Sequence, residues 1–167
     1  MTKIIVLRGN SGSGKSTITM HLKDRIDKKI LVLEQDILRR EFIKLPGIGG
    51  RNACVISLIL NTLKWAKNKF DYIILDGIYS NNRYPVMFEE IVKMFKNIYA
   101  YYFDLPFEET AKRHLTREKA KLFTVEEMKS WLKPNNKSTI LNEKILTKDM
   151  SIEQILDIIL TDIGEKN

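Results

Sequence analysis

One run of eight residues combines the residue types that bind phosphate groups. It matches the pattern G-x-x-x-x-G-K-[ST] at every fixed position and reads Gly9-Asn10-Ser11-Gly12-Ser13-Gly14-Lys15-Ser16. Its glycines allow successive backbone N–H groups to turn around an anion, Lys15 is expected to reach the β- and γ-phosphates, and Ser16 is expected to hold Mg²⁺. Together with Thr17, the run predicts a nucleotide site that takes ATP and Mg²⁺. A flexible glycine-serine turn is the alternative.

A second candidate is the carboxylate of Asp36, just after the apolar run at residues 29–33. A carboxylate at a strand end can accept the proton of an attacking hydroxyl group. Arg39 and Arg40 lie three and four residues further on, so a helix that begins at Asp36 would present them on one face, where they suit an acidic acceptor. The alternative is that Asp36 only caps a helix and pairs with Arg40.

A third candidate is Asp76, which ends the apolar run at residues 72–75. An acid in this position can orient Mg²⁺ and share that work with Ser16. The alternative is a turn-forming aspartate before Gly77. The segment that follows is polar and aromatic, and its Tyr79 and Arg83 suit recognition of an acceptor.

Two arginines on a predicted helix complete the candidate chemistry. Arg113 and Arg117 are four residues apart, so they share a helix face and are expected to neutralise charge that develops on the γ-phosphate. We expect them to act as lid arginines, with a small helical lid at about residues 117–137. The alternative is an ordinary charged helix in which Glu109 pairs with Arg113. His114, between the two arginines, is expected to be structural or to lie at the surface.

The elements that must position these residues follow from the apolar pattern. Strand-like runs at residues 3–7, 29–33, 72–75, 98–103 and 144–146 alternate with helical segments. This alternation predicts a single α/β domain over residues 1–167, with three layers and a five-stranded, mainly parallel sheet covered by helices on both faces. Capping boxes are predicted at residues 124–127 and 151–154. Ligands of such sheets bind at the carboxyl ends of the strands, where the candidates above lie.

The composition of the chain indicates which partners and which cellular location are expected. The chain has 167 residues and a formal net charge of +7, which suits a phosphate-rich partner but does not favour nucleic acid, because many lysines lie on presumptive solvated helix faces. Its single cysteine, Cys54, lies in an apolar stretch and is expected in the core. No signal peptide or membrane-spanning run is visible, so a cytoplasmic protein is expected. The glycine-rich residues 45–50, just before Arg51, are expected to form a loop near the acceptor.

With these motifs in this order, the chain resembles the small P-loop kinases that phosphorylate hydroxyl groups. It looks most similar to the predicted AAA-type kinase group related to zeta toxin, chloramphenicol phosphotransferase and the polynucleotide 5′-kinase domain, over residues 3 to about 142. The resemblance to polynucleotide kinases implies that Asp36 is the base and that Arg39 meets a phosphate group of the acceptor. It also implies that Arg113 or Arg117, or both, are lid arginines. It says little about the acceptor, and no separate substrate domain is present.

The residues and the resemblance together predict an ATP-dependent phosphotransferase that acts on a hydroxyl group of a small molecule, such as a nucleoside-, sugar- or antibiotic-like acceptor. Two alternatives stay open: a polynucleotide 5′-hydroxyl kinase, and a switch module that binds and hydrolyses a nucleotide. The preference for ATP over GTP rests on no specific element of the sequence. The expected acceptor side is formed by Arg39, Arg40, Arg51, Tyr79 and Arg83.

Overall fold

The computed structural model describes residues 1–43, 45, 48–116 and 118–165, with the side chains of residues 48–50, 118 and 119 left aside. Its centre is a five-stranded sheet in the order β2-β3-β1-β4-β5, and every neighbouring pair of strands is parallel. The strands are β1 (Lys3–Gly9), β2 (Ile30–Glu34), β3 (Tyr72–Gly77), β4 (Ile98–Asp104) and β5 (Glu143–Thr147). The predicted α/β class and all five predicted strands are confirmed.

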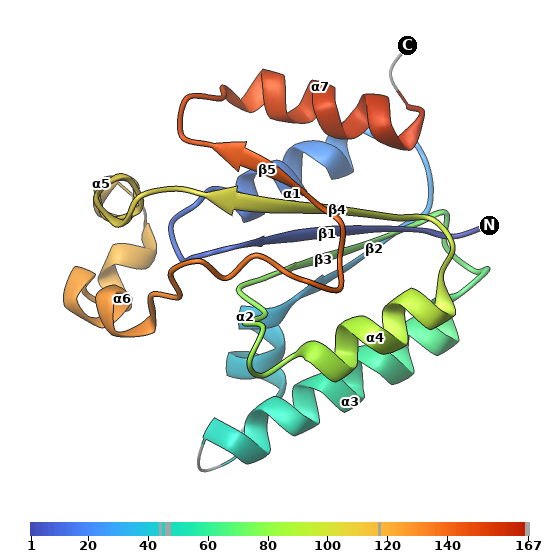
Figure 1. Ribbon diagram of the computed structural model, residues 1–167, viewed down its shortest axis with the longest axis horizontal. Coiled ribbons are helices and arrows are strands. Elements are labelled where there is room, and N and C mark those ends of the chain that lie inside the picture. Colours follow the sequence, from blue (N-terminus) through green and yellow to red (C-terminus); the bar gives the residue numbers. More distant parts are fainter. Residues whose placement is uncertain (44, 46–47, 117, 166–167) are drawn as a thin grey trace.

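Helices cover both faces of the sheet (Figure 1). On one face lie α1 (Lys15–Arg25) and α7 (Ile152–Ile163), and on the other lie α3 (Ile48–Ala66) and α4 (Pro85–Met94). The remaining helical segments gather at the carboxyl ends of the strands. They are α2 (Gln35–Ile37) with a π-helical turn (Leu38–Phe42), α5 (Phe107–Leu115), a 3₁₀ turn (Glu118–Lys121) and α6 (Val125–Trp131).

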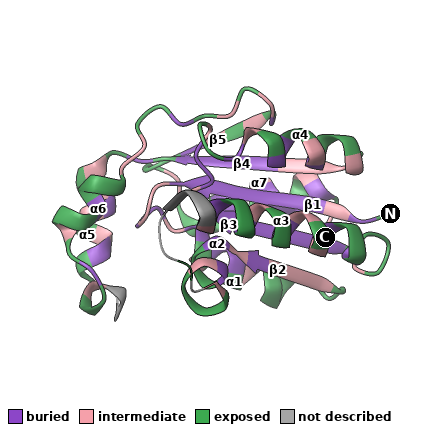
Figure 2. Cartoon of the chain, turned by 90° about the horizontal axis from the view of Figure 1, so that it is seen from below, coloured by how far each residue is buried: buried purple, intermediate pink, exposed green. Residues whose placement is uncertain are grey.

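The strand β1 shows why the sheet sits between two apolar layers. Ile4 and Val6 pack in the core under α3 and α4, while Ile5 and Leu7 pack in the core under α1 and α7. Because side chains alternate between the two faces of a strand, a continuous apolar run is what a strand buried on both faces requires. The buried strands at the centre and the exposed outer helix faces are visible in Figure 2.

Several helix ends follow local sequence signals. Both predicted capping boxes form, with Thr124 accepting from the backbone N–H of Glu127 and Ser151 accepting from that of Gln154. Gly164 ends α7 in the left-handed conformation that glycine favours. Within the described residues, no helix is both long enough and apolar enough to cross a membrane.

Two predictions about the region before and within α3 are wrong. Cys54 is exposed rather than buried, because the face of α3 that packs on the sheet is set by Val55 and Ile59, and the preceding position points away. The glycine-rich run is not all loop, since α3 already begins at Ile48. Burial of one face of this long helix outweighs the low helix propensity of glycine. Residues 46 and 47 lie outside the described residues.

Candidate active site

The predicted phosphate-binding loop lies between β1 and α1, as its sequence requires. Gly12 and Gly14 have φ angles of +85° and +99°, in the left-handed region that side chains rarely adopt. A Cβ atom at Gly12 would lie 2.6 Å from the carbonyl oxygen of Thr110 in α5, so the loop packs against α5 through a position that has no side chain. The first turn of α1 contains no acidic residue, which leaves the positive end of this helix open to an anion.

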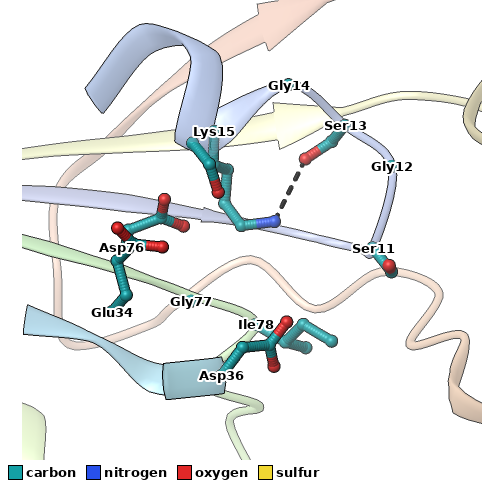
Figure 3. Close-up of a pocket in the computed structure, with 11 residues that line it drawn as sticks. Ser11, Gly12, Ser13, Gly14, Lys15, Glu34, Asp36, Asp76, Gly77 and Ile78 are labelled. Atoms are coloured by element: carbon teal, nitrogen blue, oxygen red, sulfur yellow. Dashed lines mark hydrogen bonds between the residues drawn. The ribbon is translucent and has the colours of Figure 1, made fainter. Parts of the chain in front are cut away.

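Lys15 folds back over the loop (Figure 3). Its Nζ atom donates to the carbonyl oxygens of Gly9 at 2.9 Å and Asn10 at 3.0 Å, and to Oγ of Ser13 at 3.3 Å. These contacts hold an ammonium group at the mouth of a pocket of about 50 Å³ that the loop lines. Ser16 lines the same pocket and is exposed. The arrangement suits a small anion such as a phosphate group.

Two carboxylates lie beside this pocket at the ends of neighbouring strands. Asp76 is in β3 and pairs in register with Glu34 of β2, and both line the pocket. Thr19 of α1 donates a hydrogen bond of 3.2 Å to Oδ2 of Asp76. Because Asp76 lies within a strand, the alternative of a turn-forming aspartate is wrong. The sequence reasoning missed Glu34, although it directly follows the apolar run of β2.

The residues around this pocket fit Mg²⁺ only as a partner of a bound nucleotide. Among the described residues, no group of three or more histidine, cysteine, aspartate or glutamate side chains can hold a metal ion by itself. Mg²⁺ in nucleotide sites is typically bound by one or two carboxylates together with the substrate phosphates. Ser16, Asp76 and Glu34 supply oxygen atoms of the right kind at the edge of the pocket.

Asp36 lies between two cavities. The helix α2 begins at Gln35 with Glu34 as its N-cap residue, so Asp36 does not cap the helix, and no ion pair joins it to Arg40 in the described part of the chain. The Asp36 side chain is exposed and lines the phosphate-loop pocket. It also lines a second, larger cavity. Neither the expected cap nor the expected pair with Arg40 is therefore found among the described residues.

The second cavity encloses about 630 Å³, which lies in the range of sites for small molecules. It contains all five residues that were predicted for the acceptor side. Its wall comes from the end of β2, the segment after β3, the start of α3 and the lid region. The lining residues are Ser11, Gln35, Asp36, Arg39, Arg40, Arg51, Asn52, Ile78, Tyr79, Ser80, Arg83, Tyr84, Phe123, Ser130, Trp131 and Lys133.

Tyr79 is the predicted acceptor residue that lies deepest. Its side chain is fully buried, and its hydroxyl donates to the carbonyl oxygen of Leu33 at 3.4 Å. Burial raises the pKa of the Tyr79 hydroxyl well above its ordinary value, and the nearby carboxylate of Asp76 raises it further. Tyr79 thus forms part of the cavity wall as a neutral core residue. Its φ angle of +37° is unusual for a residue with a side chain.

Two side chains hold this strained segment in place. Oε1 of Gln35 accepts hydrogen bonds from the backbone N–H groups of Ile78 at 2.9 Å and Tyr79 at 3.4 Å. The guanidinium of Arg8 donates to the carbonyl oxygen of Tyr79 through both Nε and Nη2, at 3.2 and 2.8 Å. The side chains of Gln35 and Arg8 therefore fix the backbone beside the acceptor cavity through hydrogen bonds.

Arg8 is a residue that the sequence reasoning missed. It is fully buried at the end of β1 and forms an ion pair of 2.5 Å with Glu143 of β5, which is itself buried. It also donates to Oδ1 of Asn81 and to the carbonyl oxygen of Asn136. No local sequence pattern predicts this network. An arginine at the end of a strand can equally belong to an exposed turn, and the partners of Arg8 lie up to 135 residues away in the chain.

In α5, Arg113 forms the expected pair with Glu109 and also contacts the phosphate-binding loop. Its Nε atom donates to Glu109 at 2.7 Å, which is the expected pair within the helix, and its Nη1 atom donates to the carbonyl oxygen of Ser13 at 3.4 Å. Hydrogen bonding to Arg113 also lowers the pKa of Glu109. The helix thereby places one guanidinium against the phosphate-binding loop. Arg117 lies outside the described residues.

His114 is a structural residue. It is buried, its ring stacks on Phe123 with 4.6 Å between ring centroids, and its Nε2 lies 2.9 Å from the carbonyl oxygen of Phe123. Because a carbonyl oxygen only accepts, this contact places the proton on Nε2. The Phe123 ring also contacts Arg40, whose guanidinium lies 5.4 Å from the ring centroid.

Lys133, in the segment predicted to form a lid, is joined directly to the phosphate-binding loop. The side-chain amide of Asn10 donates to the carbonyl oxygen of Lys133 at 3.3 Å and accepts from the N–H of Lys133 at 2.9 Å. Asn10 occupies a variable position of the loop motif, so the motif itself did not predict this contact. Since Lys133 also lines the large cavity, one side chain links the nucleotide side of the site to the acceptor side.

Comparison with solved structures shows the same fold in several kinases. The chain is similar to a sugar kinase from Janibacter sp. HTCC2649, with 19% identity and a TM-score of 0.69 over 99% of this chain and 97% of that one. It is similar to an APS kinase from Mycobacterium tuberculosis in complex with AMPPNP and APS, with 17% identity and a TM-score of 0.69 over 98% of each chain. A third is the tunicamycin resistance protein of Deinococcus radiodurans, with 19% identity and a TM-score of 0.72 over 99% of this chain and 98% of that one.

At these identities the comparisons show the fold, and they do not name a substrate. No protein-family profile matches the chain, and no curated protein matches its sequence significantly. The expected likeness to P-loop kinases is supported at the level of the fold, whereas the narrower group related to zeta toxin is not among the similar structures given above. The residues of the site therefore carry the information about function.

Proposed function

We propose that the protein is an ATP-dependent phosphotransferase that acts on a hydroxyl group of a small molecule. The observation that carries this proposal is the place of Asp36, which lines both the phosphate-loop pocket and the cavity of about 630 Å³. A group at the boundary of two cavities can act on a donor bound in one and an acceptor bound in the other. A switch that only hydrolyses nucleotide needs no second cavity of this size.

On the donor side, each residue has a role that its contacts support. The loop from Gly9 to Thr17 binds the phosphates of ATP, and Lys15 exchanges its present loop contacts for the β- and γ-phosphate oxygens. Ser16 and Asp76 would hold Mg²⁺, which when bound neutralises charge on the phosphates. ATP is the proposed nucleotide because a structure of the same fold was obtained with the ATP analogue AMPPNP.

On the acceptor side, Asp36 accepts the proton of the attacking hydroxyl group. The acceptor oxygen forms a bond to the γ-phosphorus while the bond from that phosphorus to the β-bridging oxygen breaks, and ADP leaves with the electron pair. Arg113, already directed at the loop, stabilises charge on the transferring group. Arg117 and the rest of a lid at about residues 117–137 are proposed to close over the nucleotide.

The similar structures support a small acceptor. Their names describe a sugar kinase and an APS kinase, and the likeness covers 97% and 98% of those two chains. We further propose that the chain is related to the group that contains zeta toxin and chloramphenicol phosphotransferase, on the strength of the order of Asp36, Asp76 and Arg113 in the sequence.

The test is ADP release from ATP, measured against a panel of hydroxyl compounds, with wild type, Asp36→Asn and Lys15→Ala side by side. Asp36→Asn keeps the size of the side chain but removes the base, so we expect transfer to fall about 10²- to 10⁴-fold while binding of AMPPNP stays unchanged. Lys15→Ala is expected to lose both phosphate transfer and the binding of AMPPNP. Asp24→Asn is the matched control, because Asp24 is exposed on α1 and lines neither cavity.

Two results would contradict the proposal. If Asp36→Asn transfers phosphate at the wild-type rate, Asp36 is not the base. If no class of acceptor stimulates ATP turnover by the wild-type protein, the site is not that of a kinase, and the nucleotide switch becomes the better interpretation.

A further inference from the structure

The wall of the large cavity carries an unbalanced charge. Five cationic side chains line it, and Asp36 is the only carboxylate among the lining residues. In the described part of the chain, none of the five forms an ion pair. The five are Arg39, Arg40, Arg51, Arg83 and Lys133.

The other described arginines behave differently. Arg8, Arg25 and Arg113 each have a carboxylate partner, at 2.5, 2.8 and 2.7 Å. Within the described residues, every arginine that lacks such a partner therefore lines this one cavity. A solvated surface does not produce this separation, because it would leave unpaired arginines on any face of the molecule.

Two of these arginines also have unsatisfied atoms. The Nε atoms of Arg39 and Arg51 are buried and have no hydrogen-bond partner in the structure, which is rare for a buried polar atom. The guanidinium of Arg51 is held by a bond of 2.7 Å from Nη2 to the carbonyl oxygen of Leu45. Arg40, by contrast, is engaged over the ring of Phe123.

Charged side chains of the cavity act on one buried hydroxyl group in its wall. The buried hydroxyl of Tyr84 donates to Oδ1 of Asn52, and it lies within electrostatic reach of Arg39, Arg83 and Asp36. Burial raises the pKa of this hydroxyl, whereas the two arginines oppose the rise and Asp36 adds to it. The arginines and the carboxylate thus act on the same part of the cavity wall.

We infer that the acceptor carries an anionic group, a phosphate, sulfate or carboxylate, in addition to the hydroxyl that is phosphorylated, and that Arg51 binds this group together with Arg39, to which the resemblance already assigns the acceptor. A guanidinium binds such anions through two parallel hydrogen bonds, which supplies the acceptors that the two Nε atoms lack. Arg39 follows Asp36 by three residues, and both line the same cavity, so one small acceptor can reach both side chains. The inference rests on the proposed function only for the role of the hydroxyl.

The test compares binding of matched pairs of probes, with AMPPNP and Mg²⁺ in excess so that the phosphate-binding loop is filled. The pairs are ribose 5-phosphate against ribose and gluconate against sorbitol, measured by calorimetry at physiological ionic strength. We expect at least one anionic probe to bind about tenfold or more tightly than its neutral partner. The stronger of the two anions then identifies phosphate or carboxylate as the preferred group.

Variants locate the group. Arg39→Gln and Arg51→Gln are each expected to remove about tenfold of the preference for the anion, and Arg39→Lys, which keeps the charge but not the fork of donors, is expected to keep part of it. Arg25→Gln is the matched control, since it removes a guanidinium that is paired at the surface. An unchanged near-ultraviolet circular dichroism spectrum shows that a variant has folded.

The outcomes separate this inference from the proposed function. Equal binding of anionic and neutral probes, or a preference that survives both glutamine substitutions, overturns the inference even if a neutral compound is phosphorylated. Binding only of an oligonucleotide, with the steep salt dependence of phosphate contacts, overturns the small-molecule form. Selective binding of an anion without any ATP turnover would support the inference and contradict the kinase.

Discussion

The buried guanidinium of Arg8 should be the most sensitive point of the fold that lies outside the candidate site. We consider Arg8→Met, which keeps much of the volume of the side chain and removes its charge and its donors. The substitution leaves Glu143 as a carboxylate with 2% side-chain exposure and no cation beside it. It also leaves the carbonyl oxygens of Tyr79 and Asn136 without this donor.

The size of the effect follows from these contacts. Removing one partner of a buried ion pair typically costs about 3–5 kcal/mol, because the remaining charge is uncompensated. Globular domains are stable by only about 5–15 kcal/mol, so this loss is a large part of the total. For a chain of this size, each kcal/mol lowers the melting temperature by about 2–4 °C, which predicts a decrease of about 6–20 °C for Arg8→Met.

The assay is urea and thermal unfolding of four proteins: wild type, Arg8→Met, Glu143→Gln and the double variant. Glu143→Gln removes the orphan charge and keeps an oxygen for the N–H of Ser138, which now donates to Oε2 at 2.6 Å. The double variant should therefore be more stable than Arg8→Met alone. A loss below about 1 kcal/mol for Arg8→Met, or a double variant no more stable than it, would refute the reasoning, because the pair would then not be an uncompensated buried charge when broken.

Two further substitutions test how the phosphate-binding loop is joined to its surroundings. Gly12→Ala should destabilise the protein by about 2–4 kcal/mol and weaken AMPPNP binding, because the new Cβ adds a clash at 2.6 Å to a left-handed φ of +85°; Gly14→Ala, whose nearest atom is 3.7 Å away, should show the backbone penalty alone, and equal losses in thermal unfolding would contradict the packing argument. Asn10→Ala should remove about 1–3 kcal/mol from the contact with Lys133, so amide hydrogen exchange should become faster in residues 125–133 and not in α7, and unchanged exchange there would show that the contact does not hold the lid region.

The parts of the structure that follow from the sequence are those with a local cause. The three central strands, β3, β1 and β4, are largely buried apolar runs, and Ile4 to Leu7 show why such a run cannot be an exposed element. The capping boxes before α6 and α7 depend on residues three positions apart, and both form. The phosphate-binding motif is equally local, and it lies at the junction of β1 and α1 where its sequence context predicted it.

What the sequence did not reveal depends on partners that are far apart in the chain. The contact of Asn10 with Lys133 spans 123 residues, and neither residue carries a local signal for it. Arg8 gives no sign of burial because its carboxylate partner lies on another strand. The prediction that Cys54 is buried was wrong for a different reason. Apolar neighbours in the sequence suggest burial, but the helical rotation from one residue to the next decides which side chains face the core.

The division of the arginines explains how one basic chain can serve both a fold and a site. Two of the three with carboxylate partners join structural elements, since Arg8 joins β1 to β5 and Arg25 joins α1 to α7. The third, Arg113, pairs within α5 and contacts the phosphate-binding loop. Those without partners among the described residues surround one cavity that touches Asp36. If the formal charge of +7 were only a means of solubility, the unpaired arginines would be spread over the surface. Their concentration instead supports the inference that the missing negative charge arrives with the second substrate, beside the hydroxyl that Asp36 is proposed to deprotonate.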